Sequence, residues 1–314
     1  MRLSLIVPCY NEEDNIENMY RAIRETFQSQ DFELELIYVN DGSRDGTLQK
    51  LKGLLPNREF CIKIVDFSRN FGKEAAIYAG LRQVTGDYAA LIDGDLQQPP
   101  ALVLEMVRFL EENEDYDCVA AFQDKRHESS LLKGFKKTFY KIINRVTDVE
   151  FVNGASDFRT FRRKMVDTIL SMTERNRFTK GIFAWVGFRT HFVPYEAAER
   201  AAGSSKWSFR KLFRYAMDGI MSFSSAPLRF AKYAGGLSVF AALVYLIVVL
   251  IRKLAFGISM SAIAPVMMLI LFLGGLNLIA MAILGEYLGR VFTEVKGRPI
   301  YIARAVLSNR DTEE

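Results

Sequence analysis

Two charge-free apolar stretches in the last third of the chain constrain its fold more than any other feature. Residues 233–251 and 262–284 contain no charged side chain, and each is close to the ~20 residues that an α-helix needs to cross a bilayer. A buried core helix is the alternative interpretation. Basic residues flank both stretches, as they commonly flank membrane spans; they are Arg229, Lys232, Arg252, Lys253, Arg290, Lys296 and Arg298. We therefore expect a transmembrane hairpin over residues 232–286.

The hairpin predicts where the rest of the chain lies. An even number of spans returns the chain to its starting side, and residue 3 begins an apolar strand without a preceding signal segment. Both termini are therefore expected to be cytoplasmic, with 287–314 as a C-terminal tail. Residues 209–231 are apolar on one side and basic on the other, which is typical of an interfacial helix. Gly274 and Gly275 would permit close helix contacts, and thus a homo-oligomer.

Residues 1–208 are expected to form the globular domain. Mean hydropathy is +0.05 although 25% of residues are charged, because the apolar excess is concentrated in the hairpin. Short apolar runs alternate here with segments of helical spacing, which predicts an α/β domain with a mostly parallel sheet. The expected strands are 3–7, 34–39, 62–67, 88–92 and 118–122, and the expected helices are 15–27, 48–55, 74–84 and 102–110.

Composition argues against several classes of function. A net charge of +4 is too small to imply nucleic acid as a partner. The three cysteines are far apart in the sequence and odd in number, so they indicate neither a zinc site nor a disulfide framework. With only two histidines, chemistry based on histidine ligands or a histidine triad is not indicated.

Two carboxylates follow the fourth expected strand. Asp93 and Asp95 are separated by Gly94, and strand alternation sends both side chains the same way. Such oxygen ligands suit Mg²⁺ or Mn²⁺, with substrate phosphates completing the shell, and the glycine would let a bulky ligand approach. A surface turn is the alternative. Because Glu12 and Asp41 follow other strands, three acidic loops are expected along one edge of the sheet.

Four further segments each have a functional and a structural interpretation. In the loop after the first strand, Tyr10 could stack on a base and Glu12 accept from it, or Asn11 could simply cap a helix. The basic, amphipathic segment 123–145 is either a solvated face or a helix that contacts membrane or phosphate. Asp157 stands beside Arg159, as a functional group or a structural ion pair. In the loop 199–208, Arg200 and Lys206 could wrap a diphosphate, or the loop could simply be mobile.

Taken together, the motifs resemble those of the membrane-anchored polyprenyl-phosphate glycosyltransferases of glycosyltransferase family 2. That family includes dolichol-phosphate mannose synthases and bacterial undecaprenyl-phosphate glucosyltransferases. The resemblance runs from residue 3 to about residue 306. It is carried by Ile6-Val7-Pro8-Cys9-Tyr10-Asn11-Glu12-Glu13, Asn40-Asp41-Gly42-Ser43-Arg44-Asp45-Gly46-Thr47, Arg69-Asn70-Phe71-Gly72-Lys73, Asp93-Gly94-Asp95-Leu96-Gln97, residues 200–208 and Leu284-Gly285-Glu286-Tyr287-Leu288-Gly289-Arg290.

The resemblance implies a nucleotide-diphospho-sugar transferase fold of the Rossmann-like GT-A type, and it implies roles for individual residues. Pro8, Tyr10, Glu12 and Asp41 would hold base and ribose, Asp93 and Asp95 the metal and donor diphosphate, and Gln97 would lie near the sugar. Asp157 matches the family's candidate base. Arg200 and Lys206 match a loop that closes over the phosphates, and Arg126, Lys133 and Ser205 are the expected acceptor contacts. The family usually has acidic residues where this chain has Gln98 and Ala101.

The implied reaction is inverting transfer of a sugar, first of all glucose from a UDP-sugar, to a polyprenyl phosphate at the cytoplasmic face of a bacterial inner membrane. A GDP-mannose or UDP-amino-sugar donor is the nearest alternative. A processive polysaccharide synthase would share the fold, but its Gln-x-x-Arg-Trp signature and additional spans do not occur here. A non-catalytic membrane scaffold that retains the fold is the alternative from another class.

Overall fold

The computed structural model describes residues 1–123, 144–145, 147, 152, 155–196, 219, 221–256 and 263–310. The chain divides into two compact units. One unit contains residues 1–145, 149–216 and 299–314, and the other contains 146–148 and 217–298.

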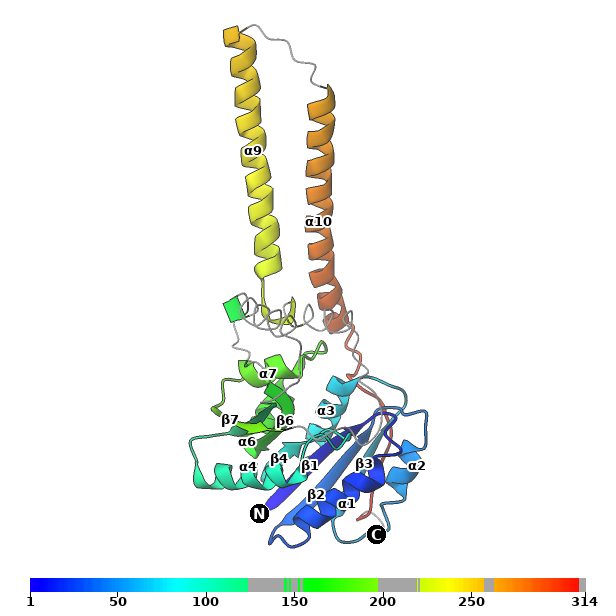
Figure 1. Ribbon diagram of the computed structural model, residues 1–314. Helices are drawn as coiled ribbons and strands as arrows, with labels where there is room; N and C mark the ends of the chain where they lie inside the picture. The colour runs from blue at the N-terminus through cyan, green and yellow to red at the C-terminus, as the bar shows by residue number, and fades with distance from the viewer. Residues whose placement is uncertain are drawn as a thin grey trace. The chain divides into compact units, whose positions relative to one another are not determined.

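An eight-stranded sheet forms the centre of the first unit, in the order β7-β5-β6-β4-β1-β2-β3-β8 (Figure 1). Only β6 and β8 run against the other strands, so the expected mostly parallel sheet is confirmed. The strands are β1 (Arg2–Cys9), β2 (Glu33–Asn40), β3 (Cys61–Phe67), β4 (Tyr88–Leu91), β5 (Cys118–Gln123), β6 (Ala155–Arg162), β7 (Thr190–Tyr195) and β8 (Ala303–Ser308).

In the described part of this unit, six helices accompany the sheet: α1 (Ile16–Phe27), α2 (Thr47–Lys52), α3 (Lys73–Arg82), α4 (Pro100–Glu112), α6 (Arg163–Ser171) and α7 (Thr179–Trp185). Strand alternation decides which face each helix covers. Leu3, Leu5 and Val7 of β1 share one core cluster with buried residues of α1 and α4. Ile6 points the other way, toward α3, where a Cβ on Gly80 would come within 2.3 Å of its side chain. This glycine allows α3 to lie close against β1.

The C-terminal segment contributes a strand that the sequence analysis did not anticipate. Within the expected tail, β8 pairs antiparallel with β3 at the edge of the sheet. Asn309 anchors it, because its side chain accepts from the backbone amide of Ile62 at 2.9 Å and donates to the carbonyls of Asn57 and Phe60 at 2.8 Å. Residues 303–309 are therefore part of the α/β unit.

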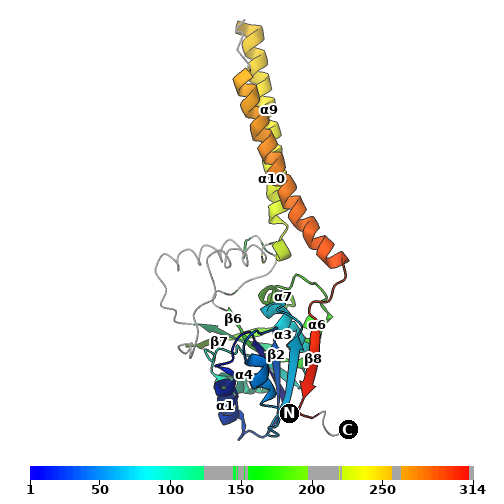
Figure 2. The same ribbon diagram turned by 90° about the vertical axis from the view of Figure 1, so that its right-hand side faces the viewer.

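Two long helices, α9 (Ala226–Phe256) and α10 (Ile263–Val295), run side by side in the second unit (Figures 1 and 2). Their segments Ala226–Arg252 and Leu269–Val295 are each long and apolar enough to cross a membrane, with mean hydropathy of 2.6 and 2.0 over their most apolar windows. Most large apolar side chains along them are exposed, as they would be toward lipid. A Cβ at Gly274 or Gly275 would touch nothing among the described residues, so these glycines are not needed for α10 to pack on α9.

Candidate active site

Loops that follow β1 and β2 are joined by hydrogen bonds. The Asn11 side chain accepts from the amide of Arg44 at 2.9 Å, and the Asn11 amide donates to Ser43 Oγ at 3.0 Å. Asn11 adopts φ +53° to do so. The expected capping of α1 by Asn11 is therefore wrong: the helix begins after Asn15, without a side-chain cap, because Asn11 is engaged with the neighbouring loop.

Residues predicted to hold base and ribose from the first loop are Pro8, Tyr10 and Glu12, and all three are partly buried. Glu12 Oε2 accepts from Asn15 Nδ2 at 2.6 Å, and the Glu12 amide donates to Thr47 Oγ1 at 2.9 Å. Glu12 thus helps to hold the start of α1 against α2. Its contact with a base stays a prediction.

Asp41 organises the loop that follows β3. Its Oδ1 accepts from the amide of Phe71 at 2.7 Å, and its Oδ2 accepts from the amide of Gly72 and from Asn70 Nδ2, both at 3.0 Å. Burial raises the pKa of Asp41, although the two amides oppose the shift. Both carboxylate oxygens are thus engaged in shaping the approach to α3, a role the sequence analysis did not assign to this residue.

Glycines are required where these two loops touch. Gly42 has φ +62°, and a Cβ there would lie 2.3 Å from the carbonyl carbon of Arg69. Gly72 has φ +98° and immediately precedes α3. A side chain at Gly42 would push the 69–72 loop away from Asp41, whereas at Gly72 it is the positive φ that favours glycine.

Asp93 follows β4 and is held by a neighbouring amide side chain. Gln98 Nε2 donates to Asp93 Oδ2 at 3.0 Å, and Gln98 Oε1 accepts from the Asp93 amide at 2.8 Å. A carboxylate at position 98 could not donate in this way, so the departure from the usual family pattern has a structural role here. Gly94 faces β1 rather than an open space, because a Cβ would lie 3.3 Å from the Pro8 carbonyl oxygen.

Asp95 and Gln97 flank a residue in an unusual backbone conformation. Leu96 has φ +60°, a region that non-glycine residues seldom occupy and that often marks functional loops. Asp95 Oδ1 accepts from the amide of Gln97 at 3.2 Å. The backbone of the turn therefore holds the Asp95 carboxylate in position.

Lys73 connects Asp93 to Asp157. Its Nζ lies 2.6 Å from Asp93 Oδ1 and 3.0 Å from Asp157 Oδ2. Antiparallel pairing explains the proximity, because β6 pairs Leu91 with Arg159, and the same register two residues further on sets Asp157 opposite Asp93. The alternative in which Asp157 pairs with Arg159 is not what forms: Arg159 Nε donates to the Ser156 carbonyl at 3.1 Å.

Charges in this cluster stabilise one another. Burial would raise the pKa of Asp157, but Lys73 and then Lys180 hold it well below its usual range. Burial would lower the pKa of Lys73, but Asp157 and Asp93 hold it well above its usual range. Both groups are therefore charged at neutral pH, and a carboxylate of such low basicity is a poor proton acceptor.

Glu74 links this cluster to α7. Its Oε2 accepts from the amide of Thr179 at 2.9 Å and also from the Thr179 hydroxyl. Burial, and next the charge of Asp157, raise the pKa of Glu74 to about 7. The start of α7 is thus tied to α3 by a carboxyl group that titrates near neutral pH.

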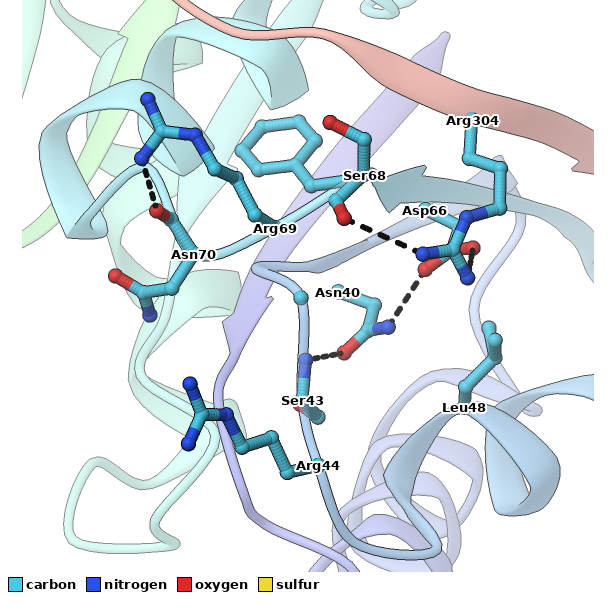
Figure 3. Close-up of a pocket in the computed structure, with 11 residues that line it drawn as sticks. Asn40, Ser43, Arg44, Leu48, Asp66, Ser68, Arg69, Asn70 and Arg304 are labelled. Carbon is cyan, nitrogen blue, oxygen red and sulfur yellow. Dashed lines mark hydrogen bonds and ion pairs between the residues drawn. The ribbon is translucent and has the colours of Figure 1, made fainter.

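A polar cavity of about 280 Å³ lies between the loops that follow β2 and β3 (Figure 3). Asn40 Nδ2 donates to Asp66 Oδ1 at 2.7 Å on one wall. Arg304 of β8 reaches the same wall, where its guanidinium donates to the Ser68 carbonyl at 3.3 Å and lies 3.6 Å from Asp66 Oδ2. Arg44 and Arg69 also line the cavity, so a polar ligand would find both donors and acceptors there.

The residues around Asp93 fit a divalent metal completed by a substrate. Among the described residues, no group of three or more His, Cys, Asp or Glu side chains could hold an ion unaided. A cation nonetheless stands at Asp93 Oδ1, in the form of the Lys73 ammonium. Two protein carboxylates, Asp93 and Asp95, with phosphate oxygens as the remaining ligands, match the way Mg²⁺ is usually bound.

The structure brings Pro8, Tyr10, Asp41, Asp93, Asp95 and Asp157 to the same end of the sheet, since their strands are neighbours and β6 begins where β4 ends. The predicted contacts of Arg126, Lys133, Arg200, Ser205 and Lys206 lie outside the described residues.

Lys73 and Gln98 were missed as site residues. One signal was available for Lys73: it opens α3, where the helix dipole disfavours a positive charge. A lysine at this position needs a nearby negative charge to offset the unfavourable interaction with the helix dipole, so it is a candidate for an ion pair with a distant residue. The signal at Gln98 was its departure from the acidic residue usual in the family, which marked the position without indicating that its amide would hold Asp93.

A sequence profile of glycosyl transferase family 2 matches residues 4–170. A glycosyltransferase of Synechocystis sp. strain PCC 6803 is 42% identical over 96% of this chain and 94% of its own length. The prophage bactoprenol glucosyl transferase homolog of Escherichia coli K12 is 37% identical over 98% of this chain and 99% of its own length. The SfII prophage-derived bactoprenol glucosyl transferase of Shigella flexneri is also 37% identical, over 97% and 98%. Because the profile covers more than half of the chain and the relatives nearly all of it, this protein is a glycosyltransferase of glycosyl transferase family 2.

Proposed function

We propose that the protein transfers glucose from a nucleoside-diphosphate sugar, most favourably UDP-glucose, to a polyprenyl phosphate. The observation that carries this proposal is the combination of the Lys73, Asp93 and Asp157 cluster at a sheet edge with two apolar helices. Relatives named bactoprenol glucosyl transferases, similar over almost the whole chain, support glucose and a lipid phosphate as substrates.

The reaction we propose is a single displacement. A phosphate oxygen of the acceptor attacks the anomeric carbon from the face opposite the leaving group, the bond to the donor β-phosphate breaks, and the nucleoside diphosphate departs with the electron pair. Mg²⁺ or Mn²⁺ held by Asp93 and Asp95 would neutralise charge on the departing diphosphate. Arg200 and Lys206 would add positive charge on the same group.

Asp157 is proposed to orient charge rather than to remove a proton. A phosphate monoester has its second pKa near ~6, so the acceptor is already mostly a dianion at neutral pH. Lys73 keeps the pKa of Asp157 below its usual range, after burial has acted the other way, which makes the carboxylate a weak base. The cation in contact with Asp157 is Lys73, whereas the sequence had suggested Arg159.

On the donor side, we propose that Pro8, Tyr10 and Glu12 contact base and ribose, with Asp41 shaping the loop beside them and Gln97 close to the sugar. The cavity lined by Asn40, Arg69 and Arg304 is a suitable neighbour for the nucleoside end.

Acceptor binding is proposed at Arg126, Lys133 and Ser205. Charge reversal at Arg126 and Lys133 should weaken use of the acceptor more than binding of the donor, because the lipid phosphate would lose its cationic partners. Steady-state rates measured against each substrate in turn would test this, and an unchanged dependence on the acceptor would remove both residues from the site.

We further propose that residues 1–208 act at the cytoplasmic face of a bacterial inner membrane, with 209–231 at the interface and both termini cytoplasmic. Anchoring would hold the site at the depth of the lipid head group, which raises the effective concentration of acceptor. A homo-oligomer through Gly274 and Gly275 is compatible with their open surroundings.

The test is transfer of radiolabelled sugar from a panel of UDP- and GDP-sugars to undecaprenyl phosphate by detergent-purified protein. A lipid-linked product from UDP-glucose, abolished by EDTA and restored by Mn²⁺ or Mg²⁺, is the expected result. The Asp95→Asn variant serves as the matched inactive control. Product only from GDP-mannose or a UDP-amino sugar would change the donor, and no product from a folded protein would favour a scaffold.

A further inference from the structure

Lys73 is a cation that two acidic groups share at the centre of the site. We propose that Lys73 is an exchangeable internal cation: it holds the place of the divalent metal at Asp93 and moves to the donor diphosphate when the metal binds. Binding of metal and binding of nucleoside diphosphate are thereby coupled. This inference rests on the proposed function, because it uses the same donor and metal.

Contacts of Lys73 place it where the exchange requires. Its ammonium lies 2.6 Å from Asp93 Oδ1 and 3.0 Å from Asp157 Oδ2, while 43% of its side chain stays exposed. Burial acts to raise the pKa of Asp157, but Lys180 lowers it in addition to Lys73, so Asp157 stays stabilised when the ammonium moves. A doubly charged cation would attract the Asp93 carboxylate more strongly than the lysine does.

Asp93 cannot readily offer a metal another oxygen. Its Oδ2 is held by Gln98 Nε2 at 3.0 Å, and Gln98 also accepts from the Asp93 amide at 2.8 Å. This two-point contact keeps Oδ1 directed at Lys73. A metal that binds Asp93 through Oδ1 must therefore displace the ammonium, and its affinity is lowered by the strength of that ion pair.

After displacement from Asp93, the Lys73 ammonium would still have partners. Asp157 still holds it from one side, and the start of the ten-residue helix α3 lies beside it, with φ +98° at Gly72 opening the turn. A diphosphate is drawn to a helix start by the exposed amides and dipole. Once there, it offers Lys73 oxygens in place of Asp93, and so repays the cost of breaking the first ion pair.

Linkage makes this exchange measurable without sugar or lipid. If metal binding frees Lys73 for the diphosphate, each ligand must raise the affinity of the other by the same factor. Removing the ammonium should tighten metal binding in the absence of nucleotide, because no ion pair has to be broken. The same change should reduce the strengthening of metal binding by nucleotide, because the diphosphate loses a cation.

The experiment measures Mn²⁺ affinity by electron paramagnetic resonance on the detergent-purified full chain, alone and with saturating UDP or GDP. For Lys73→Met we expect Mn²⁺ to bind alone about fivefold more tightly than to the unchanged protein, and the enhancement by nucleotide to shrink about fivefold or more. Lys73→Arg keeps a positive charge and should retain most of the coupling. Lys164→Met is the matched control, because it removes the same charge from Lys164 of α6, which pairs with Asp117 just before β5, and should change neither value.

Outcomes separate this inference from the proposed function. Unchanged Mn²⁺ affinity and coupling in a Lys73→Met protein with a normal melting curve would overturn the exchange while leaving the transfer reaction intact. Should Lys73→Met melt abnormally, the same measurement on Lys73→Gln decides the matter: tighter Mn²⁺ binding and reduced coupling would support the exchange, and unchanged values would overturn it. Failure of the unchanged protein to bind Mn²⁺ under any condition would overturn both the exchange and the metal in the proposed reaction.

Discussion

Both ends of the central sheet contain a carboxylate paired with a lysine, and the two ends differ in how completely those charges are satisfied. At the amino end, Glu35 of β2 lies 2.7 Å from Lys63 Nζ and has 3% of its side chain exposed. It also accepts hydrogen bonds from the Ser4 hydroxyl and from the amide and hydroxyl of Thr85. Burial would raise the pKa of Glu35, but Lys63 and then Ser4 lower it.

At the carboxyl end, the corresponding charged groups are less completely hydrogen-bonded and less buried. Among the described residues, Asp157 Oδ1 is a buried oxygen without a hydrogen-bond partner, and Lys73 is 43% exposed against 21% for Lys63. A buried charge with every contact made contributes to the fold, whereas one with contacts unmade can still bind a ligand. We therefore expect the Lys63 and Glu35 pair to be structural, and the Lys73 pair with Asp93 and Asp157 to be available for a ligand.

The largest expected effect concerns the carboxyl end. Asp95→Asn should lower sugar transfer about a thousandfold, because it removes charge that helps to hold the metal on the leaving group. Asp157→Asn should lower it less than about tenfold, since the acceptor needs no base. Transfer rates of both variants under one condition decide the matter, and equal losses of many orders would contradict the roles given to these two residues.

A mutation at the amino end should instead lower the stability of the fold. Glu35→Gln removes one partner of a buried pair and is expected to cost about 3 kcal/mol, which lowers Tm by about 10 °C. Transfer per folded molecule should not change, because Glu35 lies at the opposite end of the sheet from Asp93. The Tm from thermal melting and the transfer rate per folded molecule should both be measured for this variant. A variant of normal Tm would show that the pair at the amino end is not structural.

Glu74 sharpens the comparison through pH. Its pKa of about 7 lies above the ordinary 4.5, so the folded state binds the proton more tightly than the unfolded state, and stability falls as pH rises between these values. Glu74→Gln stays neutral and still accepts from Thr179. The variant should match the unchanged protein near pH ~5 and melt about 4 °C higher near pH ~7.5. A Tm difference that does not vary with pH would place the titration elsewhere.

The smallest expected effect is at the outer edge of the sheet. Arg304→Ala should raise the KM for the donor about twofold to fivefold and leave kcat almost unchanged, because an exposed guanidinium contributes modestly to the wall of the cavity. Donor titrations at saturating acceptor test this. Lys50→Ala, which breaks an exposed pair with Glu17, is the matched control, and an equal effect there would exclude a specific role for β8.

Local sequence pattern was sufficient for the features that depend on neighbours along the chain. Short apolar runs predicted β1 to β5 within a few residues, since a buried strand gives a continuous apolar run whereas an amphipathic helix gives apolar residues at helical spacing. The acidic loops were predicted because parallel strands end at one edge. The two long apolar helices followed from the absence of charge over 233–251 and 262–284.

Contacts between distant segments could be decided only by the tertiary structure. The meeting of Lys73 with Asp157 depends on β6 entering the sheet antiparallel beside β4, and the place of β8 depends on a segment more than 200 residues beyond β3. Asp41 illustrates both sides: its position at a strand end was evident from the sequence, but its partners were not. Hydrogen bonds and ion pairs are made by proximity in space, and a single sequence records proximity only along the chain.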